Sequence, residues 1–253
     1  SAPTSRAAMR AIGAGSAQTH LDRDTLAADV ILLATPDASL AAVAKALAEV
    51  GGRECRGKVV LHTSGALDRS VLAPLARRGA ATGSLHPMQT FSGRGVPQLR
   101  NVIFAVEGDP EARRVARGIA RSLGGVPVII EGRSKAAYHV AGALAAGHAL
   151  ALFEAATQIL TKIGFPRRRA LQTLLPLIRQ MLDNFERLGP QAAWTGPIAR
   201  GDYATIAKHR KALRGYPREF QQAYAALSLL AGRVLSKAPP ATLARLRRVL
   251  AER

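Results

Sequence analysis

The chain has 253 residues, of which 48% are hydrophobic, and it carries a formal net charge of +19. This length and composition are sufficient for a folded core and exclude a disordered chain. The single cysteine, Cys55, excludes an internal disulfide framework and favours a reducing, cytoplasmic compartment. No metal site is expected, because the six histidines lack the spacing of zinc-binding motifs.

The positive charge is concentrated in the second half of the chain. Residues 1–131 carry a net charge of +5, whereas residues 132–253 carry +14. A basic half can bind nucleic acid or another polyanion. However, the densest run of arginines, 167–169, opens an apparent helix, and only 4% of the residues are aromatic and able to stack on bases. Solvent-exposed, arginine-rich helices are therefore the preferred interpretation.

Short apolar runs alternate with helical segments in the first half. Strands are predicted at residues 29–34, 58–62, 79–86, 101–108 and 126–132. Continuous apolar strands separated by helices are typical of a parallel sheet that is covered on both faces. The sequence therefore predicts an α/β class, with a doubly wound, Rossmann-type domain over residues 1–132.

The predicted strands end in residues suited to binding. Ligands of such sheets bind at the carboxyl ends of the strands, which here carry Thr35-Pro36-Asp37, Thr63-Ser64-Gly65 and His86-Pro87. Small hydroxyl residues and glycine at these turns let an anion approach helix N-termini. Each of the first two turns is also compatible with an ordinary helix cap, but their recurrence at equivalent positions favours a site.

The segment GAGSAQ, residues 13–18, resembles the glycine-rich fingerprint of dinucleotide-binding turns. Such a fingerprint follows a strand and opens a helix, whereas this segment follows helix-like residues and precedes a strand. We therefore predict that Gly13 and Gly15 end a helix. On this interpretation, the domain either has no fingerprint or lacks its first β-α-β segment.

Residues 133–253 are predicted to form a helical domain. Its first helix begins at Lys135 and ends near Lys162, and the uncharged stretch 136–153 inside it is long enough for a membrane span. The alanine- and glycine-rich composition favours instead a helix that is buried between domains or between subunits. Lys135 and His139 are four residues apart and share a face, where they are either acid–base or anchoring groups, or a solvent-reaching lysine beside a structural histidine.

Further helices are predicted after a break at residues 164–166. They cover residues 166–189, kinked or broken at Pro176, and then 202–213, 218–235 and 240–252. The loop before the second of these contains Thr195, Arg200 and Asp202, which either complete a site or form a helix junction capped by Asp202.

Three segments together resemble a known family. They are SLHPMQTF (84–91), KAAYHVAG (135–142) and TGPIARGDYATIAKH (195–209). In this order they resemble bacterial Rossmann-like proteins with a C-terminal helical domain of unknown function, which look like distant relatives of pyrroline-5-carboxylate reductase and 6-phosphogluconate dehydrogenase. The resemblance covers essentially the whole chain. It implies binding of NADP in preference to NAD, an oxidoreductase architecture and a homodimer, but no particular substrate.

The resemblance also implies roles for individual residues. In relatives a fingerprint segment of about 30 residues precedes the position where this chain starts. The implied cofactor-binding residues are Ser5 and Arg6 near the adenosine 2′-phosphate, with Thr35, Pro36, Asp37, Thr63, Ser64 and Gly65 along the cofactor. His86 and Gln89 are expected to face the nicotinamide cleft. Lys135 and His139 match catalytic positions, although His139 stands where dehydrogenase relatives have asparagine. Thr195, Arg200 and Asp202 are expected to complete the substrate site, from the same or a neighbouring subunit.

These observations lead to three ranked hypotheses. The first is an NADP-dependent reductase or dehydrogenase for a small anionic substrate, in which Lys135 or His86 relays a proton and Arg200 holds a carboxylate or phosphate. The second is a non-catalytic NADP-binding sensor or scaffold. The third is a basic nucleic-acid binder, whose affinity would fall steeply with salt.

Overall fold

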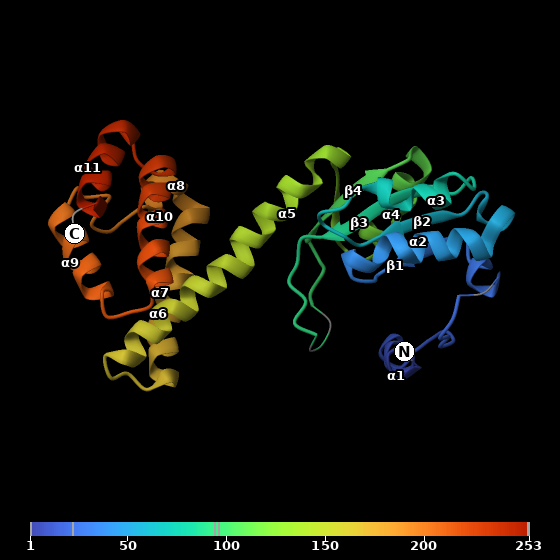
Figure 1. The fold of residues 1–253 in the computed structure, drawn as a ribbon, viewed down its shortest axis with the longest axis horizontal. Helices are drawn as coiled ribbons and strands as arrows, with labels where there is room; N and C mark the ends of the chain where they lie inside the picture. Colours follow the sequence, from blue (N-terminus) through green and yellow to red (C-terminus); the bar gives the residue numbers. More distant parts are fainter. Residues whose placement is uncertain (1, 22, 94, 96, 252–253) are drawn as a thin grey trace. The chain divides into compact units, whose positions relative to one another are not determined.

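The structure is a computed structural model that describes residues 2–21, 23–93, 95 and 97–251. The chain forms two compact units, Ser1–His148 and Ala149–Arg253 (Figure 1). The predicted domain boundary at residue 132 precedes the long helical segment, whereas the two units divide inside that segment. Its first part therefore belongs to the sheet-containing unit.

A five-stranded sheet forms the centre of the first unit. Its strands are β1 (Val30–Leu33), β2 (Val59–His62), β3 (Ala81–Pro87), β4 (Ile103–Gly108) and β5 (Val126–Ile129), and they lie side by side in sequence order. β1, β2 and β3 are parallel, and β5 is parallel to β4. The predicted α/β class is confirmed, but the sheet is mixed because β4 runs antiparallel to β3. A loop joins these two strands, whereas a parallel pair requires a longer crossover connection, usually helical.

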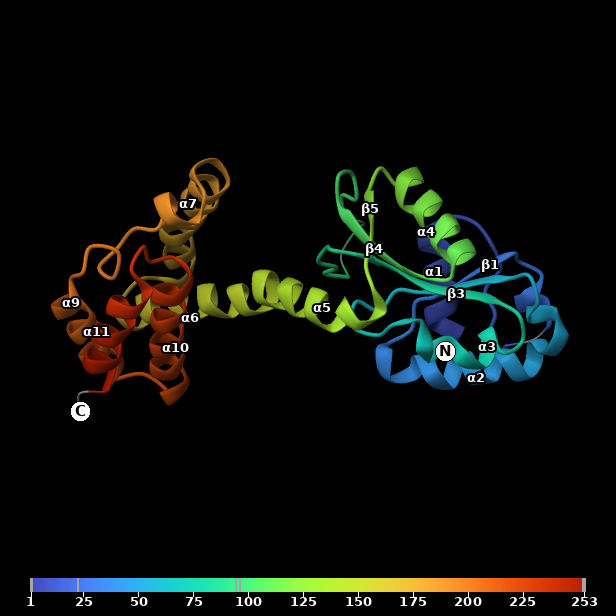
Figure 2. The same cartoon turned by 90° about the horizontal axis from the view of Figure 1, so that it is seen from above.

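Helices cover both faces of this sheet, as expected for a doubly wound domain. The first unit contains α1 (Ala2–Ile12), α2 (Asp37–Gly51), α3 (Ala73–Ala76) and α4 (Pro110–Ser122), with short 3₁₀ turns at Arg23–Leu26, Gly52–Cys55, Arg69–Leu72 and Gly132–Ser134. Figure 2 shows α2 and α3 on one face and α4 on the other. On the α4 face, Ala112, Ala116 and Ala120 are fully buried against Leu61 and Val106. Their spacing of four residues places small side chains on one stripe, which lets the helix approach the sheet closely.

The glycine-rich segment near the N-terminus is not a nucleotide-binding turn. α1 ends at Ile12, and Gly13 and Gly15 follow with φ angles of 77° and 92°. This confirms the prediction that these two glycines terminate a helix.

Nearly continuous helix follows β5. α5 (Lys135–Ala143) passes into a π-helical turn, η5 (Leu144–His148), and then into α6 (Ala149–Lys162). The ring nitrogen Nδ1 of His148 lies 2.9 Å from the carbonyl oxygen of Ala143, one residue before this turn. A π-turn holds one residue more than an α-helical turn, and such turns are frequent at functional sites.

The long apolar helix is largely exposed in the single chain. By length and composition the stretch Gly132–Lys162 could cross a membrane, with a mean hydropathy of 1.4, but only 6% of its apolar window is buried within the described structure. The described residues of this chain therefore do not bury the helix. A single helix of this composition is a weak indication of a membrane span, because helices covered by another subunit share it.

The remaining helices belong to the second unit. They are α7 (Arg167–Leu188), α8 (Pro190–Ala193), α9 (Tyr203–Leu213), α10 (Arg218–Val234) and α11 (Pro239–Ala251). α7 continues through Pro176, so the helix is not broken there. Asp202 caps α9, because its Oδ1 accepts a hydrogen bond of 3.0 Å from the backbone N–H of Thr205. This confirms the capped helix junction that the sequence offered as one interpretation.

Candidate active site

The turns after β1 and β2 are joined by one short hydrogen bond. Ser64 Oγ donates to Asp37 Oδ2 over 2.7 Å, and Asp37 is the first residue of α2. The same hydroxyl accepts hydrogen bonds from the backbone N–H groups of Ala66 (3.2 Å) and Leu67 (2.9 Å). Ser64 is therefore both the cap of its own turn and the link to the neighbouring strand end.

Thr35, which follows β1, has a buried hydroxyl that is free to form a hydrogen bond. Its Oγ1 has no hydrogen-bond partner among the described residues, although buried polar groups are nearly always paired. Pro36 follows as the N-cap residue of α2. An unpaired hydroxyl at the carboxyl edge of a parallel sheet fits a position where a ligand supplies the missing partner.

Lys135 is completely buried beneath these turns. Its Nζ donates to the carbonyl oxygen of Ser64 over 2.7 Å and to Ser84 Oγ over 2.6 Å. Burial lowers the pKa of Lys135 from 10.5 to about 8, and the carboxylates of Glu107, Asp68 and Asp37 oppose that shift. The side chain thus ties the first residue of α5 to the end of β2 and to β3.

Lys135, Ser84 and Glu107 form a buried polar cluster, with Glu107 at the end opposite Lys135. Its side chain is 8% exposed, and its Oε2 accepts a hydrogen bond from the backbone N–H of Arg69 at 2.9 Å and lies 3.5 Å from Ser84 Oγ. Burial raises the pKa of Glu107. Ser84 can therefore accept from Lys135 and donate to Glu107, which connects the two charged groups through one hydroxyl.

Two histidines lie next to the glycine of the β2 turn. The rings of His86 and His139 have centroids 6.1 Å apart. A Cβ atom at Gly65 would lie 2.6 Å from His139 Cδ2 and 2.7 Å from His86 Nε2, so only glycine leaves room for both rings. His86 Nδ1 lies 2.9 Å from the carbonyl oxygen of Thr63, and burial is the main cause that lowers the pKa of His86.

The tautomer of His86 follows from its partner. A carbonyl oxygen only accepts hydrogen bonds, so Nδ1 carries the proton when the ring is neutral. Nε2 then presents a lone pair, and it has no hydrogen-bond partner among the described residues.

A pocket of about 330 Å³ opens beside these histidines. Its lining residues come from the end of β3 with the following loop and from α5 with η5; they are His86, Met88, Gln89, Thr90, His139, Gly142, Ala143, Ala145, Ala146 and Gly147. The helical wall beyond His139 consists of alanine and glycine only. The amide of Gln89 is engaged within its own loop, because Nε2 donates to Gln98 O over 3.1 Å and Oε1 accepts from Thr90 N over 2.8 Å.

The structure brings together most of the residues predicted in the first unit. The turns at residues 35–37 and 63–65 meet at one edge of the sheet, and His86, Gln89 and His139 line the pocket beside them. Lys135 lies below this edge and does not line the pocket. Ser5 and Arg6 lie on helix α1 rather than at a strand end.

The remaining predicted residues, Thr195, Arg200 and Asp202, belong to the second unit. Asp202 is engaged there as a helix cap, and its Oδ2 accepts a hydrogen bond of 2.6 Å from Thr205 Oγ1. Sequence reasoning missed Ser84 and Glu107. The signal for Glu107 was present, because it is the only charged residue inside the otherwise apolar strand 103–108.

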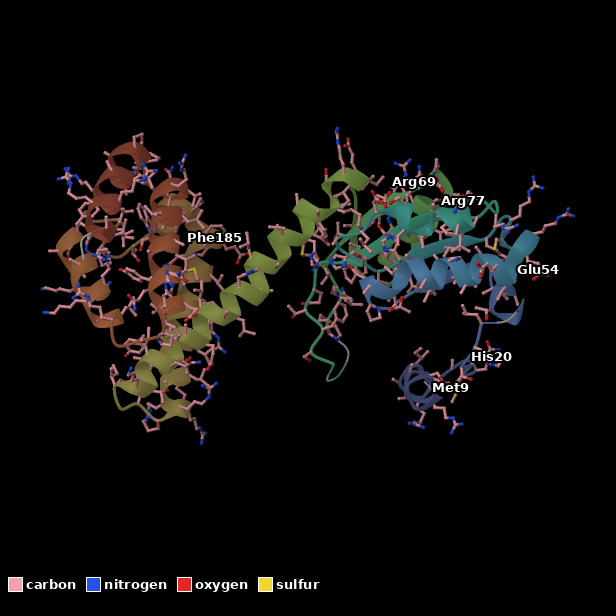
Figure 3. All side chains as sticks on the ribbon, in the orientation of Figure 1. Met9, His20, Glu54, Arg69, Arg77 and Phe185 are labelled. Atoms are coloured by element: carbon pink, nitrogen blue, oxygen red, sulfur yellow. The ribbon has the colours of Figure 1, made fainter. Side chains whose placement is uncertain are left out.

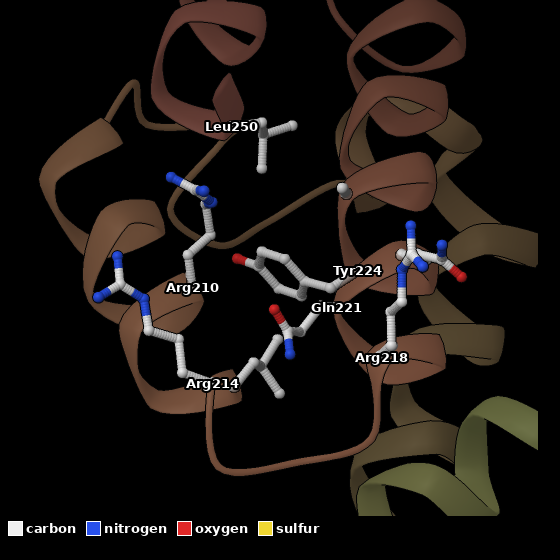
Figure 4. Close-up of a pocket in the computed structure, with 9 residues that line it drawn as sticks. Arg210, Arg214, Arg218, Gln221, Tyr224 and Leu250 are labelled. Carbon is white, nitrogen blue, oxygen red and sulfur yellow. The ribbon is translucent and has the colours of Figure 1, made fainter. Parts of the chain in front are cut away.

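The second unit has a basic pocket of its own, with a volume of about 270 Å³. Figure 4 shows Arg210 and Arg214, from α9 and its end, on one side of the pocket and Arg218, Gln221 and Tyr224 of α10 on the other. Arg210 Nη1 donates to the carbonyl oxygen of Val249 near the end of α11 over 2.6 Å, which satisfies a free helix-terminal carbonyl. Within the described part of the chain, none of the three arginines pairs with a carboxylate.

Comparisons with known proteins agree with this architecture. A model of a Rossmann-like domain matches residues 1–87, and a model described as a domain of unknown function, DUF2520, matches residues 102–231. No curated protein sequence matches the chain significantly.

Solved structures share the fold at low sequence identity. A Bacteroides fragilis protein, described provisionally as an NADP oxidoreductase, is 23% identical with a TM-score of 0.67, over 79% of this chain and 73% of that one. Protein TM1727 of Thermotoga maritima is 23% identical with a TM-score of 0.63, over 99% and 87%. A reductive aminase of Aspergillus terreus, in complex with NADPH and ethyl-5-oxohexanoate, is 19% identical with a TM-score of 0.56, over 82% and 74%. These likenesses establish the fold, and because the DUF2520 model matches more than half of its residues, the chain belongs to the DUF2520 family.

Proposed function

We propose that the chain is an NADP-dependent oxidoreductase that acts on a small molecule. The observation that carries this proposal is the pocket with His86 and His139 at the carboxyl edge of the sheet, directly beside the Gly65 turn. This is where ligands of doubly wound sheets bind. Support also comes from the structural neighbours, which include enzymes solved with NADPH.

The residues at the strand ends fit a dinucleotide. Thr35 offers an unpaired buried hydroxyl, and the lack of a side chain at Gly65 lets the rings of His86 and His139 pack against the turn. We assign cofactor contacts to the turns at residues 35–37 and 63–65. The preference for NADP over NAD rests on Arg6, through the family resemblance, because arginine suits a 2′-phosphate. When bound, the nicotinamide supplies or accepts a hydride.

The side chains of this chain then have distinct tasks. His86 is oriented by the Thr63 carbonyl so that Nε2 can exchange a proton with a substrate atom in the pocket. His139 lies beside it on α5 and lines the same pocket. Lys135, being fully buried and bonded to Ser64 and Ser84, acts on the site by holding the strand-end turns in place.

A calorimetric titration of the chain with NADPH and, separately, NADH tests the cofactor assignment. We expect NADPH to bind more tightly than NADH, and Gly65→Ala to weaken both at least tenfold, because its Cβ displaces the histidine rings. Ser122→Ala, at an exposed serine bonded only to the end of its own helix, is the control and should bind like the wild type. Absence of binding by either cofactor would contradict the proposal.

A non-catalytic NADP sensor is the second candidate function. It predicts the same titration result, but no oxidation or reduction with any substrate. Turnover measured with a panel of alcohols and carbonyl compounds separates the two.

We further propose a homodimer and a cytoplasmic location. Leu177, Met181, Phe185 and Leu188 form one apolar stripe of α7, with Leu177 66% exposed and Phe185 54% exposed. Figure 3 labels Phe185 of this stripe. Contiguous exposed apolar patches of this kind mark interaction surfaces. The cytoplasmic location rests on Cys55, a free and buried thiol.

Light scattering coupled to size-exclusion chromatography tests the dimer. Leu177→Asp should convert a dimer into a monomer, because it places a charge in the middle of the apolar stripe. Gln172→Asp, on the opposite side of the same helix, adds the same charge and should leave the dimer intact. A wild-type protein that elutes as a monomer would refute the dimer assignment.

A further inference from the structure

The described wall of the pocket beside the two histidines carries no formal charge. Among the described residues that line it, ten in all, none is lysine, arginine, aspartate or glutamate. A carboxylate or phosphate that loses its water without a cationic partner pays a large desolvation penalty. The walls therefore disfavour the small anion that the sequence predicted.

The buried lysine below the pocket does not supply the missing positive charge. Both of its described hydrogen bonds run to groups of the protein, Ser64 and Ser84. Three carboxylates, those of Glu107, Asp68 and Asp37, lie close enough to interact with its charge. One ammonium group surrounded by three carboxylates gives this edge of the sheet no excess positive charge with which to attract an anion.

His86 selects for a hydrogen-bond donor on the ligand. Because Nδ1 is committed to the carbonyl of Thr63, the unpaired Nε2 of the neutral ring is an acceptor. Burial lowers the pKa of His86, so the neutral ring prevails at pH 7. A hydroxyl or an N–H group can donate to this nitrogen, whereas a carboxylate cannot.

The same walls argue against an amine. A simple alkylamine is protonated at neutral pH, and none of the described lining residues is a carboxylate that could pair with an ammonium group. The helical wall that continues beyond His139 consists of Gly142, Ala143, Ala145, Ala146 and Gly147, which offer an apolar surface to a ring or a short alkyl chain.

We infer that this pocket takes an uncharged alcohol, with the hydroxyl donating to His86 Nε2 and the apolar part on the alanine–glycine wall. The inference deepens the proposed function, since it names the substrate class of the same site. It replaces the anionic substrate expected from the sequence with a neutral one.

The test uses ligands with one carbon skeleton and different charge. They are 1-phenylethanol, mandelate, in which a carboxylate replaces the methyl group, and 1-phenylethylamine, in which an ammonium group replaces the hydroxyl. Each is titrated by calorimetry into the full chain saturated with NADP⁺. The ¹⁵N chemical shift of His86 Nε2 is followed in parallel, because it reports a hydrogen bond to this atom independently of turnover.

We expect 1-phenylethanol to bind at least tenfold more tightly than the two charged ligands and to shift the Nε2 resonance of His86. Tighter binding of mandelate or of the amine, or no binding of the alcohol, overturns the inference. If NADP⁺ itself does not bind, the proposed function fails, and the same three titrations on the unloaded chain still decide the preference for an uncharged ligand.

A charged substitution in the pocket wall, paired with an uncharged one of similar size, tests the same preference from the side of the protein. Ala146→Lys puts an ammonium group into the pocket and should reverse the preference, so that mandelate binds more tightly than 1-phenylethanol. Ala146→Met adds similar bulk without charge and should keep the preference of the wild type. An unchanged preference in Ala146→Lys, with its fold intact by circular dichroism, would show that the ligand binds elsewhere.

Discussion

Replacing Lys135 by methionine removes the ammonium group that joins the start of α5 to the ends of two strands. The wild-type lysine has two opposing effects on stability. Its two hydrogen bonds, to Ser64 O and Ser84 Oγ, each contribute about 1.5–3 kcal/mol because the donor is charged. Burying the charge costs about 3 kcal/mol, which corresponds to the fall of its pKa from 10.5 to about 8. At pH 7 we therefore expect Lys135→Met to lower the free energy of unfolding by up to about 3 kcal/mol.

The pH dependence of this difference is the more decisive quantity. Between pH 8 and 10.5 the unfolded chain keeps the proton on Lys135 while the folded chain releases it. The unfolded state then binds more protons, so the free energy of unfolding of the wild type rises with pH in this window. The penalty for the buried charge is complete below pH 8 and absent above 10.5. The stability difference between wild type and Lys135→Met should therefore widen by about 3 kcal/mol from pH 8 to 10.5.

Cys55 provides an assay that reports on the first unit alone. It is the only cysteine of the chain and it is fully buried, so a thiol-alkylating reagent modifies it only when this unit unfolds. Pulses of the reagent across a urea series, quantified by mass spectrometry, give the unfolding free energy of each protein at each pH. Other groups that titrate in this range, including Cys55 itself, cancel in the difference. A difference that stays constant from pH 8 to 10.5 would refute the buried, charged state of Lys135.

Three further results follow from the same site. Glu107→Gln removes the carboxylate that most strongly favours the charged form of Lys135, so the rise in stability should begin at a lower pH in the same urea assay. Asp37→Asn should loosen the link to Ser64, and we expect amide hydrogen exchange at residues 63–67 to accelerate about tenfold while exchange in β3 is unchanged; equal exchange in both segments would contradict the link. Gly65→Ala should shift the ring resonances of both neighbouring histidines, whereas unperturbed resonances would show that the turn does not pack against them.

The strands and most helices could be predicted from hydrophobic pattern because each element carries its own signal. The direction of β4 could not be predicted, since a mostly apolar strand has the same sequence pattern in a parallel and in an antiparallel pair. The meeting of the Thr63-Ser64-Gly65 turn with His86 followed from the rule that ligands gather at strand ends.

The buried polar cluster could not be predicted from the sequence, for a different reason. The sequence around Lys135 does not distinguish a lysine that reaches solvent from one that is buried in the fold. Its spacing to His139 is the same in both cases. Its partners Ser84 and Glu107 lie 51 and 28 positions earlier in the chain, and only the pairing of β3 with β4 places them opposite one another. Contacts of this kind depend on strand register, which a single sequence does not specify.

Under the proposed function, the π-helical turn at Leu144–His148 would make the length of this helix a specificity determinant. A π-turn holds one residue more than an α-helical turn, so deleting one residue here would restore α-helical winding while the helix downstream keeps its rotational phase. Ala145, Ala146 and Gly147, which now line the pocket, could then no longer all keep their places on its wall. Substitutions within the turn change the side chains of the wall, whereas a single deletion would change the path of the backbone that carries them. Relatives that differ in length at this point would therefore be expected to accept different molecules.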